Sequence, residues 1–385
     1  MTSSVVANSS PSFMDDDSSP ARIIRAAVSA IATHGIDHVT ASQLINGAHV
    51  ARSTMYSYFG DVYGVFAELW RAAGPQWFDE VVSGDTPSDQ GVPGLSDALT
   101  EILLASPRIS DLYDVVAPDL ADAFVRQRGE SDISAQRAIW RWAVTLGFHL
   151  SAPEWSTTRD EMLRLIDLAP DHLAETLALP PLAGSSNLSD EMPLIVPLGP
   201  EAPISEILAD ASVQVAARSG IANASLLRIC RYARVTTGAV PANLRQLDVL
   251  MLDGYRQWLR DVVATNMADV QRNADLSLPE RFVRTFHWSL SDYRATWRRY
   301  RRELHLAARH DPVMAAELHA EIDFTAGYIT ESFERYGTTT HFAQLLGQSS
   351  HAFALATSLL HDLGLPLRQS DHRLMAQWIF KQTGN

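Results

Sequence analysis

Apolar residues recur every three or four positions along almost the whole chain, which is the spacing of one face of an α-helix. No convincing alternation of apolar and polar residues predicts a strand. A Gly/Pro/Ser-rich loop covers residues 83–94, and a longer break, PPLAGSSNLSDEMPLIVPLGPEAP, covers residues 180–203. The six prolines of the longer break exclude a continuous helix there. The pattern predicts an all-α chain in two halves, joined by a Pro-rich linker.

Start and stop signals near the N-terminus predict a series of short helices. Ser19 is suited to cap a first helix, because its hydroxyl can accept a hydrogen bond from the first turn. Pro20 is suited to be the first helical residue, because its φ angle is already that of a helix. Gly35 is typical of the left-handed residue that ends a helix.

A second and a third helix follow. Thr40 and Gln43 match a capping box, which predicts a helix over residues 41–47. A tight turn is expected at residues 48–50, with His49 in the left-handed conformation, and a third helix runs from about Arg52 to Phe59. Three short helices with a tight turn between the last two are typical of a helix-turn-helix.

The segment AHVARSTMYSYF at residues 48–59, preceded by Val39-Thr40 and followed by Val65, resembles the TetR-type (tetracycline-repressor-like) transcriptional regulators. The resemblance extends over residues 20–66. The family pattern has Ser where this chain has Ala51, commonly His in place of Tyr58, and a phosphate-contacting Lys in place of Val62. The resemblance implies a DNA-binding domain over residues 19–66, with its motif at about 41–60 and its third helix in the major groove of double-stranded DNA.

The resemblance also assigns DNA-binding candidates. Arg52 is suited to read guanine or to bind a phosphate, although a solvated surface arginine is the alternative. Tyr56 is the family tyrosine, with core packing as its alternative. The other candidates for backbone or base contacts are Thr40, Gln43, Ser53, Thr54, Ser57 and Tyr58. Basic residues are sparse in this domain, so we expect its DNA binding to be weak or salt-sensitive. Its charged residues are Arg22, Arg25 and Arg52 against Asp37 and Asp61.

The second half of the chain resembles the first. Without gaps, residues 26–65 align with residues 211–250, and the identical positions of the first copy are Ala26, Val28, Ala32, Gly35, Ile36, Ala48 and Val50. This pattern predicts two tandem TetR-like units, with chance alignment of Ala-rich helices as the alternative.

The second copy, residues 204–250, is divergent. Thr236 supplies the cap that Ala51 lacks, but Pro241 stands where the tyrosine is expected, and an interior proline costs a helix about 3 kcal/mol. This copy either contacts DNA in an altered geometry or serves as a packing module. The candidates for a second reader are Arg228, Arg234, Thr236, Thr237 and Arg245.

Residues 67–179 and 251–385 are expected to be helical regulatory domains. The resemblance implies that they enclose a pocket for an unknown small-molecule effector and form a dimer interface, within a homodimer or an intrachain pseudo-dimer. Their aromatic residues, which include Trp70, Trp77, Trp140, Trp142, Phe282 and Phe286, are candidates for such a pocket or for plain core. An arginine-rich stretch is interpreted as a solvated helix face rather than a site for an acidic ligand or the DNA backbone; it contains Arg294, Arg298, Arg299, Arg301 and Arg302.

Composition narrows the class of protein. The 385 residues carry a net charge of −14, which argues against a surface covered in phosphate-binding residues but not against a local DNA-binding face. The single cysteine, Cys230, excludes a disulfide framework, and no apolar run is long enough to span a membrane. Residues 1–18 are polar and acidic, so a disordered tail is expected. Residues 1–12 lack the basic patch and apolar stretch of a signal peptide, and together with the single cysteine and the absence of a membrane-length run this predicts a cytoplasmic location.

No catalytic motif, metal cluster or phosphate-binding loop is present in the sequence, so neither enzymatic activity nor a cofactor is expected. The sequence therefore favours a sequence-specific DNA-binding transcriptional regulator, most simply a ligand-responsive repressor. The alternative is a sensor or interaction protein that does not bind DNA and is built on decayed TetR-like domains, which Val62, Pro241 and the acidic total charge favour.

Overall fold

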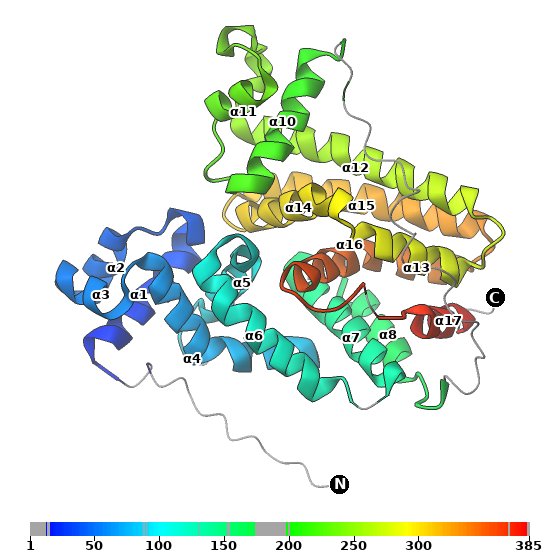
Figure 1. The fold of residues 1–385 in the computed structure, drawn as a ribbon, viewed down its shortest axis with the longest axis horizontal. Helices are drawn as coiled ribbons and strands as arrows, with labels where there is room; N and C mark the ends of the chain where they lie inside the picture. Colours follow the sequence, from blue (N-terminus) through cyan, green and yellow to red (C-terminus); the bar gives the residue numbers. More distant parts are fainter. Residues whose placement is uncertain are drawn as a thin grey trace. The chain divides into compact units, whose positions relative to one another are not determined.

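The computed structural model is all-helical over the residues it describes, which are 13, 16–87, 89, 91–129, 131–151, 155–173, 198, 201–368 and 370–382 (Figure 1). The tail expected at residues 1–18 and the linker expected at 180–203 lie largely outside these residues. The chain forms two compact units, Met1–Leu120 and Ala121–Asn385. The boundary between them falls inside helix α6 (Ser110–Gln127), whereas the sequence pattern placed its main break at the linker.

The first unit is built around α1 (Ser19–His34), which packs against α2, α4 and α5. Its other elements are η1 (Ile36–His38), α2 (Ala41–Ala48), α3 (Arg52–Phe59), α4 (Val62–Ser83), α5 (Leu95–Ala105), η2 (Ser106–Arg108) and the first part of α6. Ser18 caps α1, one residue before the predicted Ser19, and its own N–H and hydroxyl donate to the carboxylate of Asp16. The sequence prediction of this cap was therefore wrong by one residue.

The short link between α1 and α2 is held by charged groups of α5 and η2. The buried carboxylate of Glu101 on α5 accepts a hydrogen bond of 2.8 Å from the N–H of Ile36. Arg108 donates to Asp37 at 2.5 Å, and both side chains are mostly buried. These contacts hold η1 in place, and with it the start of α2.

The second unit contains the remaining helices of both halves of the sequence. Its elements are the end of α6, α7 (Asp132–Ser151), α8 (Ser156–Asp167), α10 (Ile204–Ser219), α11 (Leu226–Ala233), η4 (Thr237–Ala239), η5 (Ala242–Leu244), α12 (Leu247–Arg272), α13 (Leu278–Ser289), η6 (Asp292–Arg294), α14 (Ala295–Ala308), α15 (Pro312–Arg335), α16 (Thr340–Asp362) and α17 (Arg373–Lys381). Helix α10 packs against α11, α12 and α14, while α16 packs against α7, α8, α14 and α15.

Helices α7 and α8 of the first half pack with α16 and α17 of the second half (Figure 1). The backbones of α7 and α16 approach so closely that a Cβ atom on Gly147 would lie 2.2 Å from the carbonyl oxygen of Ala352. The indole N–H of Trp140 lies 3.3 Å from Nδ1 of His372, and that of Trp378 donates to the carbonyl of Leu165 at 2.8 Å. This packing explains why residues 121–173 belong to the same compact unit as the second half.

The arginine-rich stretch is not a solvated face, so that interpretation was wrong. Arg294, Arg298, Arg301 and Arg302 are buried, whereas Arg299 is exposed. Helix α14 is covered by α10, α15 and α16, which leaves little of its surface free. Both Arg298 and Arg302 donate to the carboxylate of Asp362 at the end of α16.

The close crossing of α7 and α16 gives a direct test of their packing. Gly147→Ala should lower the free energy of unfolding of the second unit by about 1–3 kcal/mol, because the added methyl group forces the two helices apart. Gly327→Ala on α15 is the matched control, since nothing lies within 4 Å of its Cβ position and a helical Ala is favourable by roughly 1 kcal/mol. Urea unfolding of the two variants and the parent protein makes the comparison. Equal losses, or none at Gly147, would contradict this packing.

Candidate functional site

The turn between α2 and α3 is defined by local hydrogen bonds. The Thr40 hydroxyl accepts from the N–H of Gln43 at 3.3 Å, and the Gln43 side-chain oxygen accepts from the N–H of Thr40 at 2.7 Å, so the predicted capping box is confirmed. His49 is left-handed, with φ 52° and ψ 48°, as predicted. The N–H of Val50 bonds to the carbonyl of Ile45, which closes the turn.

Helix α3 is anchored on one side and open on the other. Met55 is fully buried, and Phe59 is half-buried. The guanidinium carbon of Arg52 lies 5.5 Å from the ring centre of Tyr56, and its NH2 group lies 3.4 Å from the tyrosine hydroxyl. The exposed side is thus rich in hydroxyl groups and carries one arginine; its exposed residues are Arg52, Ser53, Tyr56, Ser57 and Tyr58. We call this surface the α3 face.

Comparison with known families identifies the element that carries this face. The model of the family described as bacterial regulatory proteins, tetR family, matches residues 23–69. Residues 23–69 therefore carry a TetR-type domain. The match covers α1, α2, α3 and the beginning of α4. None of the curated proteins compared with the chain matches it significantly.

The TetR-type domain places the predicted DNA-binding residues in two groups. Arg52, Ser53, Tyr56, Ser57 and Tyr58 share the α3 face, with Tyr58 60% exposed. Thr54 is half-buried, and its carbonyl accepts a hydrogen bond from the Ser57 hydroxyl. Thr40 and Gln43 instead bond to each other in the capping box, so their local role is to start α2. A DNA contact for any of these residues remains a prediction.

Positive charge is scarce beside the α3 face. Arg25 donates to the carbonyls of Phe13 and Asp16 and lies 3.6 Å from the carboxylate of Asp17, so much of its charge is offset. Val62, where the family has a lysine, is the first residue of α4. Arg22, on the same helix as Arg25, is half-buried, so Arg52 is the arginine that α3 itself offers to a phosphate.

The second copy repeats the turn of the first. Gly220 and Gly35 have nearly the same backbone angles, φ 79° and ψ 154° against φ 83° and ψ 146°. The hydroxyl of Ser225 caps α11, and Arg234 is left-handed at the position that corresponds to His49. Helix α12 begins at Leu247, which the alignment of the two copies places on Val62, the first residue of α4.

The reading element of the second copy differs from α3. Pro241 separates two short 3-10 turns, η4 and η5, in the place of one α-helix. The side chain of Thr236 makes no capping hydrogen bond, so the prediction that it caps a reading helix was wrong. No helix in the described residues presents Thr236 and Thr237 together. All five candidates for a second reader are exposed, namely Arg228, Arg234, Thr236, Thr237 and Arg245.

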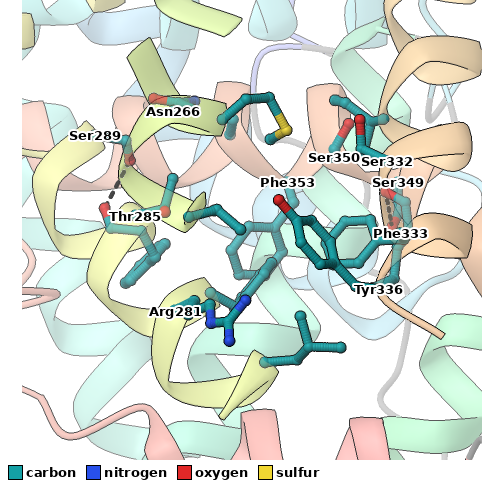
Figure 2. A pocket seen from close by; sticks show the side chains of 18 of the residues that line it. Asn266, Arg281, Thr285, Ser289, Ser332, Phe333, Tyr336, Ser349, Ser350 and Phe353 are labelled. Atoms are coloured by element: carbon teal, nitrogen blue, oxygen red, sulfur yellow. Dashed lines mark hydrogen bonds between the residues drawn. The ribbon is translucent and has the colours of Figure 1, made fainter. Parts of the chain in front are cut away.

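A cavity of about 180 Å³ lies in the second unit, among α12, α13, α15 and α16 (Figure 2). Of the predicted aromatic residues, Trp140 of α7 and Phe282 and Phe286 of α13 line it, whereas Trp70, Trp77 and Trp142 are fully buried core. The lining is mainly apolar, with a few polar side chains that include Asn266, Arg281, Thr285 and Tyr336.

No helix in the described part of the chain combines the length and hydropathy of a membrane span.

Arg281 was not among the functional candidates that the sequence pattern suggested. Arg284 on the same helix forms an ion pair with Asp269, whereas Arg281 donates to the backbone carbonyls of Leu276 at 2.8 Å and Ala274 at 2.5 Å. One weak feature of the sequence could have indicated it. No acidic residue stands three or four positions from Arg281 on its helix, so the sequence offers it no ion-pair partner there.

The α3 face can be tested by removing its two central side chains. Replacement of both Arg52 and Tyr56 by Ala should abolish specific DNA binding without unfolding the domain, because both side chains are exposed and Met55 still anchors the helix. A good bidentate base contact alone is worth about 1–3 kcal/mol. Fluorescence anisotropy with a DNA fragment selected by the parent protein measures the effect, and the thermal midpoint checks folding.

Arg71→Ala is the control for a general loss of charge, since Arg71 forms an exposed ion pair with Glu68 on α4. Its affinity for DNA should stay close to that of the parent. Unchanged affinity in the double variant would remove α3 from the DNA interface.

Proposed function

We propose that the α3 face binds operator DNA and that a small molecule in the cavity of the second unit controls this binding, as in a ligand-responsive repressor. The observation that carries the DNA-binding part is the α2–turn–α3 geometry with an exposed face of one arginine and several hydroxyl groups. Arginine and hydroxyl side chains are suited to base edges and phosphates in the major groove.

A continuous helix offers a route for control, because α6 belongs to both units. Near its middle, the carboxylate of Asp119 accepts a hydrogen bond of 3.0 Å from the indole N–H of Trp70 on α4, the helix that follows α3. At its end, Gln127 accepts from the indole N–H of Trp142 on α7 at 2.8 Å. Trp140 of the same α7 lines the cavity. Movement of α7 on ligand binding would therefore act on α4 through α6, and would favour one of two positions of the α3 face.

We further propose that the chain arose by tandem duplication and acts as an intrachain pseudo-dimer. The matched backbone angles of Gly35 and Gly220 and of His49 and Arg234 support the duplication. The packing of α7 and α8 against α16 and α17 supports pairing of the two halves within one chain. With η4 and η5 in place of a reading helix, such a pseudo-dimer would read bases mainly through α3.

Selection of genomic DNA fragments by the purified protein at moderate salt, followed by sequencing, tests this arrangement. An intrachain pseudo-dimer with one reading helix should enrich a short site without twofold symmetry. A clean palindrome would instead indicate that two chains pair, with the second copy as scaffold. No enrichment over random fragments would favour a sensor that does not bind DNA.

A further inference from the structure

The cavity of the second unit contains a cation without an acidic partner. Arg281 on α13 lies within ion-pair distance of no carboxylate among the described residues, and two of its groups, Nε and NH2, donate to backbone carbonyls. Its guanidinium carbon lies 5.7 Å from the ring centre of Tyr336. Figure 2 shows the guanidinium beside Tyr336, among the side chains that line the cavity. The remaining N–H groups of Arg281 are therefore available to an acceptor in the cavity.

Two hydroxyl groups near Arg281 lack hydrogen-bond partners. Thr285 lies one helical turn after Arg281 on the same face of α13, and its hydroxyl oxygen is buried without a partner. The hydroxyl of Tyr336 bonds to no other described residue. A buried hydroxyl without a partner is unfavourable, and a ligand acceptor would satisfy it. The guanidinium of Arg281 lies by the Tyr336 ring and the start of α13, and Thr285 supplies a further donor one turn along the helix.

Further positive charge lies directly behind the wall of the cavity. Arg294 donates to Asn266 at 3.3 Å, Arg298 to the carbonyl of Ser289 at 3.1 Å, and Arg301 to the carbonyl of Ala354, and all three acceptors line the cavity. Burial lowers the pKa of Arg294 to about 9 and that of Arg301 to about 10, so both remain protonated at neutral pH.

Carboxylates offset part of this charge, since Asp261 of α12 acts on Arg294 and the buried Glu303 lies on α14 with Arg298 and Arg301. Asp362 is the carboxylate that accepts from Arg298 and Arg302, whereas Arg294 and Arg301 donate to neutral oxygens. Asp269 on α12 is paired with Arg284. Arg281 is thus the cation of the lining without a carboxylate partner among the described residues, and an anion beside it would be stabilised while a cation would be repelled.

The rest of the wall requires an apolar body. Phe282, Phe286, Phe333 and Phe353 contribute aromatic rings. The volume of about 180 Å³ holds on the order of ten water-sized groups. We infer that the cavity binds a small carboxylic acid with an aryl or acyl body, whose carboxylate accepts hydrogen bonds from Arg281, while the hydroxyls of Thr285 and Tyr336 offer further donors in the same cavity. This inference names the ligand class of the cavity that the proposed function treats as the effector site.

Three compounds with one carbon skeleton test the inference, namely 4-phenylbutanoate, 4-phenylbutanamide and 4-phenylbutylammonium. Titration calorimetry at neutral pH should show the carboxylate binding at least tenfold more tightly than the amide, and the ammonium binding most weakly. In Arg281→Met the preference for the carboxylate over the amide should disappear. Arg272→Met, which removes an exposed arginine from α12, is the matched control and should keep it. Thermal midpoints of both variants establish that they are folded.

Equal affinity for the three compounds, binding of none of them, or an unchanged preference in Arg281→Met would overturn the inference. DNA affinity, measured with and without 4-phenylbutanoate on a selected fragment, separates this inference from the proposed function. A carboxylate preference that depends on Arg281 but leaves DNA affinity unchanged would uphold the ligand class and reject ligand control. A change in DNA affinity that the amide produces equally would uphold ligand control and reject a carboxylic acid as the ligand class.

Discussion

The architecture depends on the contact between α7 and α16. These helices come from opposite halves of the sequence, and they cross so closely that Gly147 has no room for a side chain beside the carbonyl of Ala352. Around this crossing, Trp140 reaches His372 and Trp378 reaches the backbone at Leu165. Close helix packing of this kind buries apolar surface along the full length of both helices. It makes one structural unit of helices that lie far apart in the sequence.

The TetR-type domain and the segment at residues 204–250, which we propose to be its second copy, share the turn but not the helix after it. Both keep the turn, because it rests on a capping hydroxyl and one left-handed residue, which are Thr40 and His49 in one copy and Ser225 and Arg234 in the other. Only the first keeps an α-helix after the turn. Pro241 cannot donate a backbone hydrogen bond, and the chain around it forms 3-10 turns instead. A segment that served only for packing would need the turn but not the reading helix.

The sequence predicted the features that depend on neighbouring residues. The capping box at Thr40 and the left-handed His49 arise from hydrogen bonds within a few positions, so their patterns are visible in the chain, as was the family of residues 20–66. Burial of Arg298 and Arg302 was not predictable, because their partner, Asp362, is distant in the sequence and belongs to another helix. For the same reason the cavity residues Arg281 and Tyr336, which come from α13 and the end of α15, could not be associated from the sequence.

Joining both halves in one polypeptide changes how their assembly responds to dilution. Two separate subunits pair only above their dissociation constant, so a regulator present in few copies per cell would spend part of its time as monomers. For α7 and α16 the pairing is intramolecular, and the covalent connection fixes the effective concentration of each half for the other. The paired state then persists however scarce the protein is.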